Sequence, residues 1–334
     1  MNKTHPAYWP VLAVVAALCV GSAGWPAAAQ DAAGAAGASV PIDLRPKWTA
    51  GQTARYEFWN LIEQTVDTQF GERSRSQSTD TEITGEITWT VDRVADDGTA
   101  DCTMRLDWML FEITSSADGK SETQVVDSRR SPSAELKPMH DLISAMAAVP
   151  VKVKVAPDGH VLEVAGMDAM KKKTDNPDSV PSELDFIETA SDLASIPYAP
   201  TPGTAGGLAI GKTWKADYRW DHEMGETDQR WSYTLDRLED IGGVAVAVVT
   251  GEGKIKLDPE LPDRPADAPP VDVKMLKGRA SNEVLFDLSR HEAVGRNSTA
   301  EEEIRVSVAF PDGRKFVRTV TETTRSQTLR ISEE

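Results

Sequence analysis

Alternation of apolar and polar side chains is the dominant pattern along the chain. Between positions 100 and 110 the even positions are apolar and the odd positions mostly polar, which predicts a strand with one buried face. A strand with one solvated face is typical of an antiparallel sheet. The side chains expected to face inward are Ala100, Cys102, Met104, Leu106, Trp108 and Leu110.

Two Pro-Asp-Gly sequences predict tight turns, because proline presets φ and glycine accepts a positive φ. Pro157-Asp158-Gly159 joins the alternating segments 151–155 and 161–164, and Pro311-Asp312-Gly313 joins 304–310 to 315–324. Each set predicts a β-hairpin. Residues 244–249 are apolar at every position, so we expect both faces of that strand to be covered.

Two segments have the apolar spacing of helices. Residues 135–148 carry apolar side chains three or four positions apart, with Pro138 confined to the first turn. Residues 182–195 begin with Ser182 and Asp185, an approximate capping box. We therefore expect two helices to cover parts of the sheet.

The chain contains an internal similarity. Residues 89–98 read WTVDRVADDG and residues 233–242 read YTLDRLEDIG, with five of the ten positions identical. A Gly-x-Thr sequence precedes each, at residues 51–53 and 211–213. Chance similarity between hairpins with the same turn chemistry is the alternative explanation. The ordered context favours a duplication, so the predicted fold class is mainly β (α+β): antiparallel, duplicated β-hairpin-rich halves with two or three short covering helices.

The N-terminus resembles a secretory signal. Lys3 and His5 form a positive start, residues 11–20 are apolar, and small residues lead up to position 29. Ten apolar residues are too few to cross a membrane as a helix, so the mature chain is expected to be exported, periplasmic or extracellular. Leu18 before Cys19 disfavours lipid attachment. Only Cys102 then remains, and it is expected to be a buried, inert thiol without a disulfide partner.

The expected organisation has five parts. Low-complexity Ala/Gly sequence follows the signal, and a Pro/Gly-rich connector separates the two halves. The predicted boundaries are 1–29 for the signal peptide, 30–43 for the disordered leader, 44–168 for the first β-rich half, 169–206 for the loop, helix and connector, and 207–334 for the second half.

Composition excludes several partners. The chain has 334 residues and a net charge of −17, which disfavours nucleic acids and anionic membrane surfaces. Hydrophobic residues make up 40%, enough for a substantial core and too many for a wholly disordered chain.

Apparent catalytic motifs are better explained as structure. Residues 206–213 match the phosphate-loop pattern, but a Pro-rich segment precedes them and a strand-like segment follows, where a helix is required. The histidines have no metal-binding spacing, and the Asp-Gly pairs lack the rest of a calcium loop. No serine elbow is present. We predict no catalytic residues, no cofactor, no metal and no nucleotide.

Four repeated residues are the candidate ligand-binding positions. Arg93 and Arg237 are predicted to share a face with Trp89 and Tyr233 respectively, where each arginine could bind an anion inside a concave sheet. The alternative is structural: each arginine forms an ion pair near a hairpin end.

The layout resembles an uncharacterised family of exported β-rich bacterial proteins. The resemblance rests on Leu44, Gly51 and Tyr56, on a late strand at 284–287, and on a central segment containing Val153, Val155, Asp158, Gly159, Val161, Val164 and Gly166. It implies an envelope protein without catalytic residues to carry over. The architecture is also similar to periplasmic half-barrels of the lipoprotein-localisation type.

These patterns favour an exported, soluble envelope protein that binds an apolar or protein ligand on a concave sheet without catalysing a reaction. One alternative is a secreted or periplasmic hydrolase with a carboxylate-based site, and another is a structural domain of an envelope assembly. Close carboxylates with perturbed pKa values on the concave face would favour the hydrolase, and an apolar concave face would favour binding.

Overall fold

The computed structural model describes residues 42–173, 208–222, 225–259 and 268–331. The predicted signal, most of the leader, the helix at 182–195 and nearly all of the connector lie outside these residues. Of the two predicted helices, the one at 135–148 is present and begins two residues later, at Lys137.

Strands make up most of the described chain. The first half contains β1 (Thr53–Phe70), β2 (Arg73–Val94), β3 (Ala100–Ala117), β4 (Lys120–Asp127), α2 (Lys137–Ala148), β5 (Val151–Val155), β6 (Val161–Ala165) and α3 (Met167–Lys171). The second contains β7 (Thr213–His222), β8 (Gly225–Ile241), β9 (Val244–Pro259), β10 (Val271–Asp287), β11 (Glu292–Ala309) and β12 (Lys315–Ile331). The sequence pattern did not predict α3.

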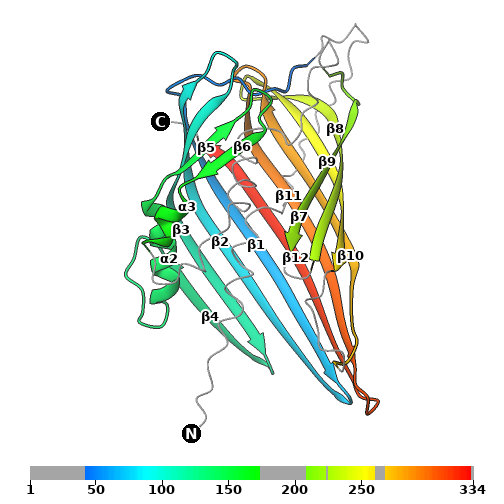
Figure 1. Ribbon diagram of the computed structural model, residues 1–334. Helices are drawn as coiled ribbons and strands as arrows, with labels where there is room; N and C mark the ends of the chain where they lie inside the picture. The colour runs from blue at the N-terminus through cyan, green and yellow to red at the C-terminus, as the bar shows by residue number, and fades with distance from the viewer. Residues whose placement is uncertain (1–41, 174–207, 223–224, 260–267, 332–334) are drawn as a thin grey trace.

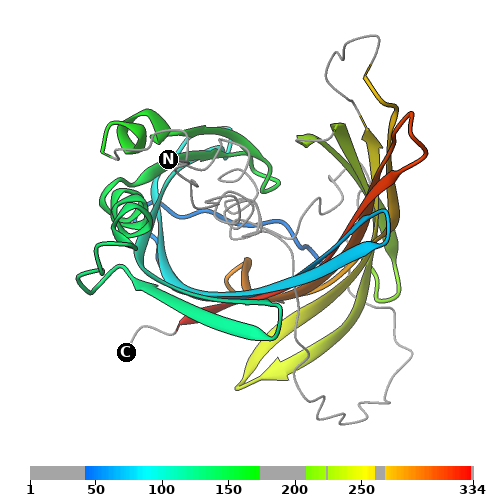
Figure 2. The ribbon, with the colours of Figure 1, turned by 90° about the horizontal axis from the view of Figure 1, so that it is seen from below.

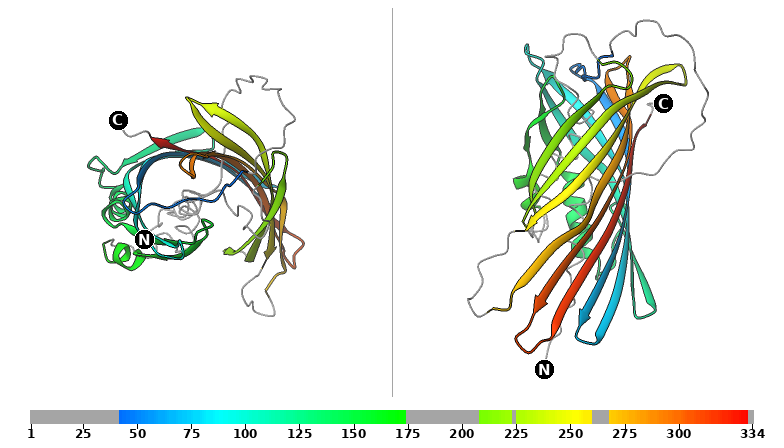
Figure 3. Two further views of the ribbon diagram at one scale, coloured as in Figure 1. Left: turned by 90° about the horizontal axis from the view of Figure 1, so that it is seen from above. Right: turned by 90° about the vertical axis from the view of Figure 1, so that its right-hand side faces the viewer.

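All twelve strands form one antiparallel sheet, which confirms the predicted mainly β fold class. Its order is β6-β5-β3-β2-β1-β12-β11-β10-β9-β8-β7, and β4 pairs with β3 outside this path. The sheet curves into a trough, with α2 and α3 at its β3–β6 end (Figures 1 and 2). The view from above in Figure 3 shows the same arc.

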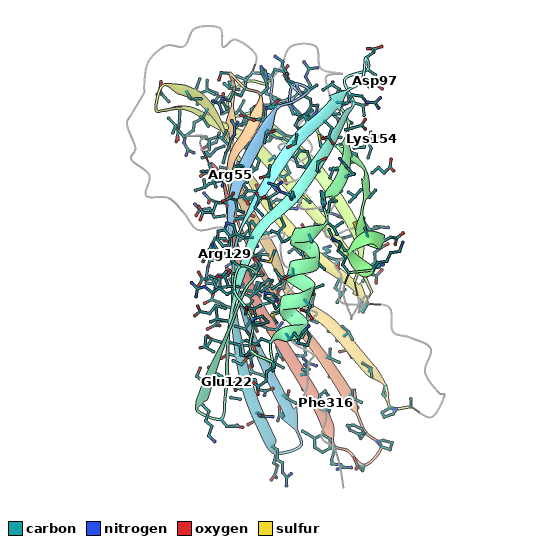
Figure 4. All side chains as sticks on the ribbon, turned by 90° about the vertical axis from the view of Figure 1, so that its left-hand side faces the viewer. Arg55, Asp97, Glu122, Arg129, Lys154 and Phe316 are labelled. Atoms are coloured by element: carbon teal, nitrogen blue, oxygen red, sulfur yellow. The ribbon has the colours of Figure 1, made fainter. Side chains whose placement is uncertain are left out.

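The two sides of the trough carry different side chains. Arg55 and Arg129 lie on the convex side (Figure 4). Arg55 on β1 is exposed, whereas its neighbours Ala54 and Tyr56 are buried on the opposite, concave side. The core therefore lies on the concave face, and the convex face is the solvated one.

The first and last strands join the two halves. Strand β1 pairs with β12 along nearly its whole length, from Arg55 opposite Ile331 to Phe70 opposite Phe316. The halves consequently belong to one continuous sheet. Strands β6 and β7, which flank the predicted boundary in sequence, lie at opposite edges of this sheet.

Two hydrophobic clusters fill the concave side. One lies over β1–β6 and includes Trp89, Val91, Cys102 and Ile143 of α2. The other lies over β7–β11 and includes Tyr233, Leu235, Val249 and Phe286. A third, smaller cluster of Val246, Val248 and Leu285 lies on the opposite face of β9 and β10. Burial on both faces, predicted for residues 244–249 from their continuous apolar run, is found at 246–249, whereas Val244 is half-buried and Ala245 is exposed.

The two similar segments have the same local geometry. Gly51 donates its backbone N–H to Val91 at 2.8 Å, and Gly211 donates to Leu235 at 2.7 Å. Both glycines have positive φ, 84° and 81°. Strand β7 begins at Thr213, so the strand predicted after the phosphate-loop-like sequence is present. A duplication explains this equivalence and stays a prediction.

A β-bulge corrects the predicted inward row of β3. The register shifts between Glu86 and Ile87, which leaves Asp107 as an extra residue on β3. Met109 and Phe111 are therefore buried, at 2% and 5% exposure, in place of the predicted Trp108 and Leu110. Trp108 instead lies on the convex side under the Arg129 guanidinium, 4.1 Å from its ring centroid.

A buried ion pair joins the end of β12 to the start of β11. Arg330 donates to Glu292, and both side chains are at most 13% exposed. Gln52 also donates to Glu292, at 3.0 Å. Burial raises the pKa of Glu292, while Arg330 and Arg290 oppose that rise. The pair therefore ties β11 and β12 to the segment that precedes β1.

Leu235→Ala should lower the free energy of unfolding by about 2–5 kcal/mol, because Leu235 is fully buried and truncation leaves a cavity. Leu238→Ala is the matched control on the same strand, since Leu238 is 43% exposed, and should cost less than about 1 kcal/mol. Denaturant titration measures both. Equal losses would show that the assignment of faces on β8 is wrong.

Arg330→Met should destabilise the fold by about 2–4 kcal/mol, because it leaves the buried Glu292 carboxylate with only Arg290, 3.7 Å away, as a cation. Arg325 lies on the same strand as Arg330 and forms a more exposed ion pair with Glu63 of β1. Arg325→Met should cost about 1 kcal/mol or less. Adding Glu292→Leu to Arg330→Met should restore much of the loss. A double variant as unstable as Arg330→Met alone would contradict this account.

Candidate functional site

The four predicted ligand-binding residues divide between the two faces of the sheet. Register shifts lie between Val91 and Arg93 and, in the second half, between Leu235 and Arg237. The extra residue in each bulge reverses the side to which the next side chain points. Arg93 and Arg237 therefore lie on the convex side, and the prediction that they share a face with the aromatic residues is wrong.

Both arginines have carboxylate partners on the convex side. Arg93 is 74% exposed and pairs with Asp101 at 2.7 Å. Arg237 pairs with Asp236 and Glu239, both at 2.6 Å, and lies 3.5 Å from Glu283. These contacts match the structural alternative, an ion pair near a hairpin end.

The two aromatic residues are buried on the concave side, one in each large cluster. Trp89 is 4% exposed, with its ring centroid 6.4 Å from that of Trp48. Tyr233 is 1% exposed and stacks between Trp214 and Trp231, at 5.7 and 5.5 Å. The structure therefore does not bring the four predicted residues together, and their role as ligand contacts stays a prediction.

Glycines on β9 make room for the aromatic stack. A Cβ at Gly251 would lie 2.7 Å from the Tyr233 ring, and one at Gly253 would lie 2.8 Å from the Trp231 ring. Both glycines occupy concave-face positions opposite those aromatic residues. The Tyr233 and Trp231 rings consequently lie flat over β9. This side of the trough is therefore filled by packed side chains.

Polar residues form a patch on the concave face of the central strands. Asn60 lies opposite Ser326, and Gln64 lies opposite Glu322. Strand β11 adds Glu302, directly opposite Glu322. We call this patch the polar belt and define it as Asn60, Gln64, Asn282, Glu302, Glu322 and Thr324.

Two neighbouring carboxyl groups dominate the electrostatics of the polar belt. Gln64 donates to Glu322 Oε2 at 2.9 Å, and the Thr324 hydroxyl lies 3.4 Å from Glu322 Oε1. Burial, together with the neighbouring charge of Glu322, raises the pKa of Glu302 to about 7. Near neutral pH, Glu302 therefore gains or loses its proton, while Gln64 and Thr324 donate hydrogen bonds to Glu322.

Two amide oxygens of the polar belt are buried without a donor. Asn60 is 1% exposed, and its Oδ1 has no hydrogen-bond partner among the described residues. The same holds for Asn282 Oδ1. A buried acceptor without a donor is costly, so both positions are suited to a donor supplied from outside the sheet.

Apolar side chains continue along the same strands beyond the polar belt. Val66, Val320, Ile304 and Met275 follow one another across β1, β12, β11 and β10 in register. In the next row toward the hairpin at 310–314, Val306 and Val273 are apolar, whereas Thr68 and Arg318 are polar. The row after it is apolar again. We call this surface the apolar strip and define it as Val66, Phe70, Val273, Met275, Ile304, Val306, Val308, Phe316 and Val320.

The apolar strip retains accessible surface. Phe70 is 39% exposed, and Val66, Met275, Val306 and Val320 are half-buried. The convex positions between them on β12 are Thr319, Thr321 and Thr323. Most apolar side chains of β12 at this end of the trough therefore lie on the concave side, and Val317 is the exception on the convex side.

Other chemistry in the described chain is limited. Burial raises the pKa of the Cys102 thiol to about 12, so it is unreactive near neutral pH. His, Cys, Asp and Glu side chains form no group of three suited to a metal ion within the described ranges. No helix in the described chain is long and apolar enough to cross a membrane.

Sequence reasoning missed the polar belt. Its residues come from β1, β10, β11 and β12, which are far apart in the chain and meet only through sheet pairing. One signal was present in the sequence: Glu302 and Ile304 alternate with Glu301 and Glu303, which places one glutamate of an acidic run on the buried face.

Glu302→Gln should change the pH dependence of stability. Folded Glu302 holds its proton up to about pH 7, compared with an ordinary pKa of 4.5, so folding takes up a proton between these values. The stability of the native protein should fall as pH rises through that window, relative to the variant. Thermal unfolding at several pH values measures the difference. Glu303→Gln, on the convex side, is the control, and identical pH profiles for the native protein and Glu302→Gln would contradict the account.

No family model and no curated protein matches the chain. Among solved structures, lipovitellin is similar over 85% of this chain, with a TM-score of 0.47 and 10% identity. This chain spans about a quarter of that protein, since 25% of the lipovitellin chain is covered.

Two bacterial proteins are more distant in structure. OccK5 of Pseudomonas aeruginosa matches 84% of this chain and 99% of its own, with a TM-score of 0.19 and 9% identity. A DUF1329 family protein from Desulfovibrio piger matches 80% of this chain and 84% of its own, with a TM-score of 0.12 and 11% identity. These are likenesses of β-rich backbone and carry no activity over to this chain.

Proposed function

We propose that the protein is a non-enzymatic module that binds an apolar ligand of the alkyl-chain type on the concave face of its sheet. The observation that carries the proposal is the apolar strip, whose side chains keep accessible surface on the inner side of the trough. Contact with an alkyl chain would remove that surface from water, at about 25 cal/mol per Å² of apolar area.

The shape of the sheet supports a chain-like ligand. The strip crosses four adjacent strands, β1, β12, β11 and β10, and polar Thr68 and Arg318 lie between its apolar members on β1 and β12. The sheet curves around its concave side, so the strip faces inward and neighbouring strands can contact a ligand from more than one direction (Figure 2). Isolated apolar side chains scattered over a surface would offer no such continuous contact.

Export is part of this proposal. The apolar segment near the N-terminus, followed by small residues, supports a protein that functions outside the cytoplasm, in the periplasm or beyond the cell. An apolar compound crossing an aqueous compartment needs a carrier that covers its surface. The proposed role is therefore that of an envelope protein that holds such a compound.

A second candidate function is hydrolysis. The observation that favours it is the Glu302–Glu322 pair, since a carboxyl group with a raised pKa beside a second carboxyl group can take part in acid–base catalysis. Hydrolysis of nitrophenyl esters or glycosides that disappears in Glu322→Gln would support this candidate. Binding without turnover would support the carrier.

Val320→Asp should weaken binding of an apolar fluorescent probe by about tenfold or more, because it places a carboxylate within the apolar strip. Val317→Asp is the matched control: Val317 is also half-buried on β12 but faces the convex side, and its variant should bind as the native protein does. Fluorescence titration with N-phenyl-1-naphthylamine measures both, and circular dichroism checks the fold. Equal affinities for the two variants would show that the ligand does not use the strip.

A further inference from the structure

The polar belt and the apolar strip meet along one line across three strands. On β1, Gln64 is followed on the same face by Val66. On β12, Glu322 is followed by Val320, and on β11, Glu302 is followed by Ile304. Side chains of one face are two residues apart, so the change from polar to apolar occurs at the same level on all three strands.

The change from polar to apolar side chains corresponds to the junction between the head group and the alkyl chain of an amphipathic molecule. An alkyl chain lying on the strip would bring its polar end to the carboxyl groups of Glu302 and Glu322. Both side chains are half-buried, so they retain access for a ligand. The chemistry of the polar belt therefore selects the head group of any amphiphile that the strip holds.

The polar belt offers acceptors and negative charge. Its unsatisfied atoms are Asn60 Oδ1 and Asn282 Oδ1, both acceptors. The Glu322 carboxylate accepts a hydrogen bond from Gln64, and Glu302 lies beside it with no ion-pair partner in the described part of the chain. A head group that donates hydrogen bonds and carries positive charge complements this set, whereas a phosphate or carboxylate would be repelled.

Within the described residues, neither Glu302 nor Glu322 has an ion-pair partner. The buried concave cation of β11 is Arg296, six residues from Glu302 and therefore about 20 Å along the strand. On β10 the concave position opposite Glu302 is Gly278, while Lys277 and Arg279 pair with Glu301 on the convex side. On β12 the next cation on the concave face is Arg318, four residues from Glu322 and therefore about 13 Å along the strand. On β1 the facing residue, Gln64, is uncharged.

Asn60 gives a second, independent indication of a ligand. Its side chain is almost completely buried on the same face, one side-chain step from Thr324, which contacts Glu322. An unbonded amide oxygen at such a site has no structural benefit, because a hydrophobic residue of similar size would avoid the desolvation cost. A donor beyond the ammonium position, such as a hydroxyl, would satisfy it.

We propose that the polar belt binds the cationic, hydrogen-bond-donating head group of an amphipathic ligand whose alkyl chain lies on the apolar strip. The proposal rests on the proposed function and specifies the class of ligand. A primary ammonium is the simplest such head, with three N–H donors for the Glu302 and Glu322 carboxylates. When it binds, Glu302 gives up its proton to solvent, and the ammonium keeps all of its own.

The test compares three amphiphiles with the same alkyl chain and different heads: dodecylamine, dodecyl glucoside and dodecanoate. Displacement of N-phenyl-1-naphthylamine from the full protein gives the three affinities. We expect dodecylamine to bind most tightly and dodecanoate most weakly, with about tenfold or more between them, because the ammonium forms charge-assisted hydrogen bonds. The affinity for dodecylamine should rise with pH through the pKa of Glu302, about 7, whereas that for dodecyl glucoside should stay constant.

Two variants separate the head group from the chain. Glu302→Gln should fold, since it replaces a carboxyl that is readily protonated, and it should abolish both the preference for dodecylamine and its pH dependence. Glu303→Gln, the neighbouring residue on the convex side, should behave as the native protein does. Matched behaviour of Glu302→Gln and Glu303→Gln would overturn the proposal.

The outcomes distinguish this inference from the proposed function. Equal affinity for all three amphiphiles, or tighter binding of dodecanoate, would overturn the head-group assignment while leaving apolar binding in place. Binding of none of the three, together with no binding of the probe, would overturn both. Tightest binding of dodecylamine, lost in Glu302→Gln and kept in Glu303→Gln, would establish the head-group site.

Discussion

Pairing between β1 and β12 is the constraint on which the rest of the structure depends. These strands come from opposite ends of the described chain, and their register fixes which residues of the two halves lie side by side. Because side chains alternate strictly along a strand, a shift of one residue would move the polar belt and the apolar strip to the convex side. The ion pair of Arg330 with Glu292 and the Gln52 hydrogen bond lie close to one end of this pairing.

Bulges determine which face the functional side chains reach. At Asp107 the extra residue buries Met109 and Phe111 and turns Trp108 outward. At the two repeated arginines the same device separates each guanidinium from the aromatic residue that precedes it. A short alternating motif therefore predicts a strand correctly but places the residues after the bulge on the wrong face of the sheet. One inserted residue reverses the face of every later side chain.

The two ends of the concave face carry different kinds of side chain. Near the turns that open β1 and β7, the inner face is filled by packed aromatic and aliphatic side chains. Beyond the middle of the strands, polar acceptors give way to half-buried apolar residues. A trough that is solid at one end and retains accessible apolar surface at the other is suited to holding one part of an elongated molecule. Polar side chains at the transition can fix how far that molecule extends.

The sequence by itself determined the class of fold. Alternation of apolar and polar residues, the Pro-Asp-Gly turns and one helical segment depend only on residues close together in the chain. The sequence also predicted two-sided burial for residues 244–249, which holds at 246–249, and the strand that follows Lys212. Only the tertiary structure decided that the halves share one sheet, that Arg93 and Arg237 lie on its convex side, and that Gln64, Glu302 and Glu322 meet. Those facts depend on long-range strand register and on single-residue bulges, and neither is encoded in the spacing of residues along one strand.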